Sequence, residues 1–147
     1  MLHTTFRMAR KAGACRSEYS KMAEALGGIK KYGEDTPIPL DRVLEVCGLD
    51  AALWCLCCVI EPADREIRLF ACDCAEHILP IYAKRYPGDT TFGAGEDAVV
   101  AAWDVARFAA WAARAVARDT ALAAWDAENQ WQEKKFREML AKFEEIE

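Results

Sequence analysis

The C-terminal third of the sequence lacks the two residues that most often end a helix. No proline follows Pro87 and no glycine follows Gly95, so nothing in residues 95–147 interrupts a helical backbone. Alanine, the residue with the highest helix propensity, recurs through the first half of this stretch. We therefore expect one very long alanine-rich helix over residues 95–147, or two helices that share an axis.

Long apolar runs and strand patterns are also missing. The longest apolar run, residues 49–60, contains Asp50 and is far shorter than the roughly 20 residues that a membrane-spanning helix needs. No stretch alternates apolar and polar residues over the length of a strand, so we expect no sheet. The N-terminus does not show the basic start and apolar core of a signal peptide. These absences favour a cytoplasmic, all-α protein that does not act in a membrane.

Motifs for catalysis are scarce as well. The chain has only two histidines, His3 and His77, and it contains neither a Gly-rich phosphate loop nor a nucleophile elbow. Cys74 and His77 share a helical face, but nothing near them in the sequence supplies an oxyanion hole or an orienting third group. We expect no enzyme activity and no cofactor, and we interpret His77 as a surface or interface histidine whose polar atoms are satisfied.

The N-terminal two thirds of the chain predicts four or five shorter helices, each bounded by a capping residue or by a glycine. Thr4 or Thr5 can cap a helix over residues 6–12, and Ser17 can cap one over residues 18–26. Further helices are expected over residues 40–47, over residues 51–60 and from Pro62 onward, the last with a kink or a break at Pro80.

At 147 residues the chain is long enough for one complete core. We expect a single helical domain over residues 1–147, in which the shorter helices pack on the long one. Its parts are basic N-terminal helices in residues 1–33, central helices in residues 34–89 and the long helix in residues 95–147.

Charge is unevenly distributed. The net charge is −5, yet residues 1–33 hold seven basic and two acidic side chains and the remainder holds 12 basic and 22 acidic ones. The basic head either docks on its own acidic body or attracts an acidic partner, such as a phosphate backbone. A nucleic-acid-binding accessory protein that uses this head is one alternative function, less favoured than protein binding.

The cysteine spacing suggests a second alternative, a zinc-stabilised or thiol-reactive protein. Cys55 and Cys58 are three residues apart, as are Cys74 and His77, and fifteen residues separate the two pairs. Each pair therefore shares one helical face, and two antiparallel helices could bring all four side chains together. Reduced, buried cysteines that act as small apolar residues fit the same helices, and we prefer this interpretation, with no metal.

The long helix carries its bulky residues on one stripe when it is plotted at about 100° per residue. Trp103 and Trp111 fall on this stripe together with Arg107, Arg114 and Arg118. These five residues either pack and form salt bridges, or they form a partner-binding surface, because Trp and Arg dominate binding hot spots. Exposure of the Trp rings distinguishes the two. A solvent-facing side is expected on the second half of the helix, with Glu128, Gln132, Lys135 and Glu138.

Several phrases follow one another in a familiar order, including GLDAALWCL at 48–56, ACDCAEHILPIYAKRYPGD at 71–89 and the later Ala-Trp-Asp and Ala-Ala-Arg repeats. This order resembles proteins from phages, prophages and bacteria, and its middle and C-terminal portions are similar to a family of alanine-rich bacterial immunity proteins. The resemblance covers most of the chain. The sequence departs from the family after residues 86–89, where it has Thr90, Thr91 and Phe92 in place of the Arg-Pro-Arg that the family would predict.

The resemblance implies stoichiometric binding of a protein partner, a toxin or a defence enzyme, in place of catalysis. A phage origin would make inhibition of a bacterial defence system the specific version of this function. The resemblance implies no catalytic residues, and a homodimer stays open.

Overall fold

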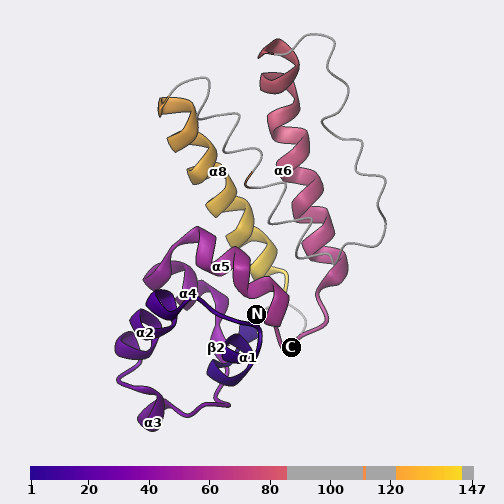
Figure 1. Cartoon of the computed structure of the whole chain (residues 1–147). Helices are drawn as coiled ribbons and strands as arrows, with labels where there is room; N and C mark the ends of the chain where they lie inside the picture. The colour runs from indigo at the N-terminus through magenta and orange to yellow at the C-terminus, as the bar shows by residue number, and fades with distance from the viewer. Residues whose placement is uncertain (86–110, 112–121, 144–147) are drawn as a thin grey trace. The chain divides into compact units, whose positions relative to one another are not determined.

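The computed structural model describes residues 1–85, 111 and 122–143, and it is mostly helical (Figure 1). The chain divides into two compact units. The first consists of Met1–Ala63 together with Arg137–Glu147, and the second consists of Asp64–Phe136. The expectation of one domain over residues 1–147 stays a prediction. Over the described residues, no helix combines the length and the apolar character needed to cross a membrane.

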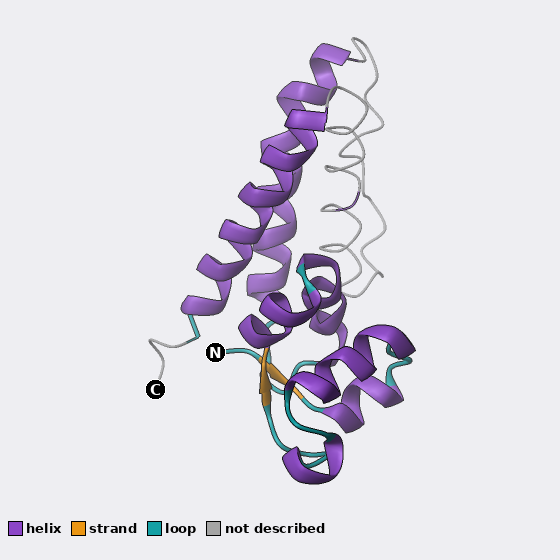
Figure 2. Cartoon of the chain, turned by 90° about the vertical axis from the view of Figure 1, so that its left-hand side faces the viewer, coloured by secondary structure: helices purple, strands orange, loops and turns teal. Residues whose placement is uncertain are grey.

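The first unit is built from short helices and one pair of very short strands (Figure 2). The predicted helices over 6–12 and 40–47 are confirmed, the second to the residue. In chain order the elements are β1 (His3–Thr4), α1 (Phe6–Lys11), α2 (Arg16–Ala25), α3 (Ile29–Tyr32), β2 (Ile38–Pro39), α4 (Leu40–Cys47), α5 (Leu49–Cys55) and the 3-10 helix η1 (Leu56–Cys58).

Local chemistry explains where these helices begin and end. The Thr5 hydroxyl accepts a hydrogen bond from the backbone N–H of Met8 at 3.1 Å, which caps α1. Gly48 has φ +87°, a conformation that L side chains rarely adopt, and it lets α4 end and α5 begin at the same residue. The predicted cap of α2 at Ser17 is wrong. That helix already begins at Arg16, after Cys15, and no side chain caps it.

The two strands correct the expectation of no sheet. They pair antiparallel, with His3 opposite Pro39 and Thr4 opposite Ile38. Strands of two residues are too short to show an alternating pattern, and this pair joins segments about 35 residues apart in the chain. The ladder brings the chain's start into the core, where Leu2 and Leu40 are fully buried.

The second unit contains α6 (Asp64–Arg85) and α8 (Leu122–Ala141), whose last residues belong to the first unit. The two helices run antiparallel, because α6 residues early in the chain meet α8 residues late in the chain. The Phe70 and Phe136 rings pack edge to face at 5.9 Å. Ile67, Phe70 and Cys74, which share one face of α6, are buried.

One boundary prediction in this region is wrong, because helix α6 begins at Asp64 and not at Pro62. The helix continues through Pro80 to Arg85, which excludes the predicted break there, and the predicted kink stays a prediction. A proline removes one hydrogen bond of the ladder, but here the helix does not end at it.

The single helix predicted over residues 95–147 is also wrong. The C-terminal helix α8 begins at Leu122 and ends at Ala141, and the Phe143 amide bonds back to the Leu140 carbonyl in the turn that follows. Asp119 and Thr120 precede α8 in the sequence, and these residue types favour a helix N-cap over a helix interior. Residues 86–110 and 112–121 lie outside the described part of the chain.

Candidate functional site

A buried acidic group lies between the two helices of the second unit. The side chain of Glu128 is 2% exposed, although its residue type and position predicted a solvent-facing side. Its Oε2 atom lies 2.8 Å from Nδ1 of His77 on α6, and its Oε1 atom accepts a hydrogen bond of 2.8 Å from Nε2 of Gln132. When the Glu128 carboxyl is ionised it only accepts hydrogen bonds, and Nδ1 of His77 is then the donor in this contact.

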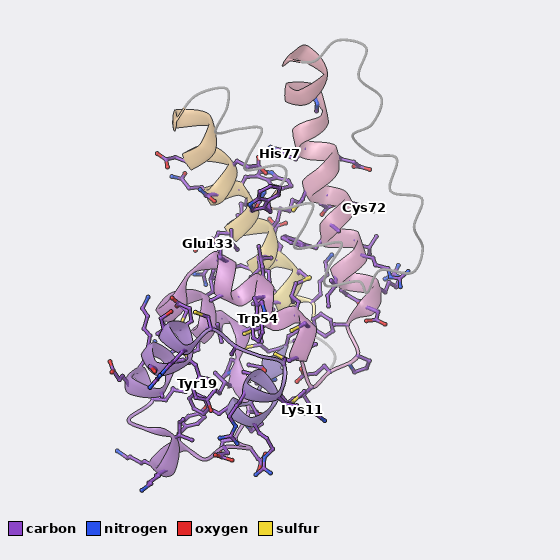
Figure 3. All side chains as sticks on the ribbon, in the orientation of Figure 1. Lys11, Tyr19, Trp54, Cys72, His77 and Glu133 are labelled. Atoms are coloured by element: carbon purple, nitrogen blue, oxygen red, sulfur yellow. The ribbon has the colours of Figure 1, made fainter. Side chains whose placement is uncertain are left out.

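The face of the His77 imidazole stacks on the indole of Trp131. The His77 and Trp131 rings are 3.8 Å apart and almost parallel, at 6°, and the His77 side chain is 36% exposed. Lys135 lies one turn further along α8, with its ammonium 5.9 Å from the centre of the Trp131 ring and 3.9 Å from Asp73. We call Asp73, His77, Trp131 and Lys135 the His77–Trp131 face. His77 is labelled in Figure 3.

This arrangement restrains the orientation of the His77 ring. The imidazole is held from behind by a buried carboxylate and from one side by an indole, so its orientation is fixed before anything binds. Lys135 and Asp73 near the two rings carry opposite charges, and the His77 ring is partly exposed. The nearest nucleophile in the sequence, Cys74, is fully buried, which keeps its thiol from a substrate in solvent.

A family model matches residues 58–139, more than half of the chain, and its description is "Imm-5 like putative immunity protein". The chain belongs to this family. The match includes α6 and nearly all of α8, and therefore the whole His77–Trp131 face. No curated protein and no solved structure matches the chain.

Within this Imm-5 like chain, the four proposed zinc ligands fall into different units. Cys55 and Cys58 belong to the first unit, whereas Cys74 and His77 belong to the second. Over residues 1–85, 111 and 122–143, no group of three or more His, Cys, Asp or Glu side chains could hold a metal ion. His77 has its contact with Glu128 instead, and the zinc interpretation therefore has no support in the described residues.

The first cysteine pair has local partners of its own. The Cys58 thiol lies 3.4 Å from the Thr4 hydroxyl, which also donates to the Cys58 carbonyl at 2.7 Å. A hydrogen bond with Cys58, together with burial, raises the pKa of the Cys55 thiol. Cys55 therefore stays protonated, which suits a packed apolar thiol and not a metal ligand.

Of the five predicted partner-binding residues, one is described. The side chain of Trp111 is 59% exposed, so burial does not exclude it from a binding surface. Trp103, Arg107, Arg114 and Arg118 lie outside the described residues.

Part of the basic head is paired within its own unit. Arg7 lies 2.7 Å from Asp35, and Arg10 lies 3.1 Å from Glu34. These contacts agree with the interpretation that the head docks on its own body, and they leave its lysines, including Lys21 and Lys30, at the exposed surface.

Sequence reasoning missed the role of Glu128, Trp131 and Gln132. These residues are spaced by three and four positions, so a helix places them on one side. That spacing was the available signal. Because Glu and Gln usually lie at the surface, the same side was predicted to face solvent, whereas Glu128 and Gln132 are buried and Glu128 contacts His77 on α6.

Proposed function

We propose that the protein is a non-enzymatic immunity-type protein that neutralises a partner protein by stoichiometric binding. The single observation that carries this proposal is the family match over residues 58–139. The geometry of the second unit agrees with it, because the described polar side chains there hold one another in place and expose an aromatic surface.

We further propose that the partner contacts the His77–Trp131 face. Tryptophan is among the residues most enriched at binding hot spots, and a ring fixed before binding loses little entropy on contact. The charges of Lys135 and Asp73 flank the rings and would orient the partner. Trp111, also exposed, is the second residue that we propose for contact.

A growth-rescue assay tests the proposal. A protein retained by the chain from its native host is identified by mass spectrometry and then expressed in bacteria with and without the chain. If the proposal is right, the retained protein slows growth, and the chain restores it at a one-to-one ratio. A retained protein that remains fully active when the chain is bound in excess would contradict neutralisation.

Variants then locate the surface. We expect Trp131→Ala to weaken binding by roughly 30-fold, the effect of losing a hot-spot residue of about 2 kcal/mol. Arg68→Ala is the matched control, because Arg68 is exposed on α6 outside the face. If both variants bind the partner equally well and their circular dichroism is unchanged, the partner does not bind at the His77–Trp131 face.

The more specific form of the proposal is that the partner is a toxin or a bacterial defence enzyme, and that a phage-encoded chain would inhibit host defence. Phage plating on hosts that carry the identified defence system, with and without the chain, measures this directly. Unchanged plating would restrict the proposal to toxin immunity.

A further inference from the structure

The first unit contains a cavity that the family match does not include. Its volume is about 500 Å³, and α1, α2, α4 and α5 contribute to its wall. This volume falls in the range of about 300–1,000 Å³ typical of small-molecule sites. Figure 3 labels two of the lining residues, Tyr19 and Trp54. The apolar part of the wall comes from Phe6, Met22, Ile38, Val43 and Trp54, among others.

Two buried polar atoms on this wall lack a hydrogen-bond partner. They are the Oε2 atom of Glu18 and the hydroxyl oxygen of Tyr19, both on α2. Burying such an atom without a partner is costly, and the great majority of buried polar atoms are therefore paired. Both oxygens belong to residues that line the cavity and can accept a hydrogen bond, so a bound donor that reaches them would remove this cost.

The charge of the wall specifies the kind of donor. Glu18 and Asp50 line the cavity, and no Lys, Arg or His is among the lining residues. Cys47 stays a neutral thiol, since burial and the neighbouring Glu18 raise its pKa. The wall is therefore formally anionic, although residues 1–33 as a whole are basic.

We propose that this cavity binds a small organic cation with one ammonium or guanidinium group on an aromatic or alkyl body. The cationic N–H groups would donate to the Glu18 carboxylate and the Tyr19 hydroxyl. The apolar body would pack against Phe6, Met22 and Trp54. None of the lining residues belongs to the family match, because every one of them precedes Cys58, where that match begins.

Three ligands of the same shape and different charge test the proposal by calorimetry on the full chain. They are phenethylamine, which is a cation at neutral pH, the neutral phenethyl alcohol and the anion phenylacetate. We expect the amine to bind at least about tenfold more tightly than the alcohol, because the ammonium pairs its own positive charge with the Glu18 carboxylate whereas the alcohol donates as a neutral group. Phenylacetate should bind more weakly than either.

Conservative variants of Glu18 and Tyr19 test whether their two oxygens cause the preference for the amine. Glu18→Gln should weaken amine binding by about tenfold or more and leave alcohol binding unchanged, and Tyr19→Phe should weaken amine binding without removing the ring that packs on Phe6 at 5.3 Å. Glu24→Gln, an exposed change on the same helix, is the matched control. Circular dichroism verifies that each variant folds.

Three results would overturn the proposal. The first is equal affinity of the wild-type protein for the amine and the alcohol. The second is a full amine preference in both Glu18→Gln and Tyr19→Phe. The third is no binding of the amine at concentrations up to about 10 mM.

Discussion

The contact between His77 and Glu128 makes a quantitative prediction about stability. A hydrogen bond to a charged group stabilises a protein by about 1.5–3 kcal/mol. We take about 2 kcal/mol here, since one partner is buried (2% exposed) while the other is 36% exposed and partly screened by water. The ring stack with Trp131 adds about 1 kcal/mol. His77→Ala should therefore lower the free energy of unfolding by about 3 kcal/mol.

The origin of this loss is tested by a double-mutant cycle. His77→Ala leaves the Glu128 carboxylate buried with one fewer donor, and Glu128→Gln removes the charge while keeping the shape. We expect Glu128→Gln alone to cost about 1 kcal/mol, because the amide oxygen can still accept from the imidazole. The double variant should be more stable than the sum of the two losses predicts, by about 1–2 kcal/mol, because the uncompensated charge is gone.

Urea unfolding followed by circular dichroism measures these free energies by linear extrapolation. The control is Glu76→Gln, an exposed carboxylate beside His77 on α6, which should change stability by less than about 0.5 kcal/mol. If the losses of His77→Ala and Glu128→Gln add to within about 0.5 kcal/mol, the two residues do not stabilise the unit through their contact, and the reasoning is refuted.

Three further predictions concern the first unit. Burial raises the pKa of Glu61, but the hydrogen bonds from His3 outweigh this effect, and the net pKa is lowered. The ionised Glu61 carboxylate therefore stabilises the fold above roughly pH 4, and this stabilisation is lost as the pH drops through the folded pKa. Glu61→Gln should flatten this loss in unfolding curves measured against pH. Hydrogen bonds with Ser17 lower the pKa of the exposed Cys15, so iodoacetamide should label it first by mass spectrometry, and earlier labelling of a buried thiol would contradict this. Gly48→Ala should cost about 1–3 kcal/mol in urea unfolding, entirely through its positive φ, because a Cβ atom there meets no neighbour within 4 Å; a neutral result would refute the strain.

Local chemistry made several elements of the fold predictable. Leu40–Cys47 lies between a proline and a glycine, and its bounds were predicted to the residue. Thr5 was one of two expected caps of the first helix. In these places, a side chain or a backbone angle next to the boundary determines it, and no distant residue is needed.

Features that depend on distant residues were not predictable in the same way. The β1–β2 ladder requires residues 3–4 to meet residues 38–39, and neither segment alone carries a strand signal. Glu128 was predicted to face solvent because its type usually does, but it is buried and contacts His77, 51 positions away in the chain. The family resemblance, in contrast, was readable from phrases in the sequence and is confirmed over residues 58–139.

The two proposed sites use separate parts of the sequence, and this separation gives a last prediction. The cavity is lined only by residues before Cys58, whereas all four residues of the His77–Trp131 face lie within the family match. If each site works on its own, Glu18→Gln should reduce amine binding and leave growth rescue intact, and Trp131→Ala should do the reverse. If Glu18→Gln also abolishes rescue while the protein stays folded, the cavity belongs to the immunity function. The organic cation would then stand in for a basic side chain of the partner, and the N-terminal unit would contribute to its recognition.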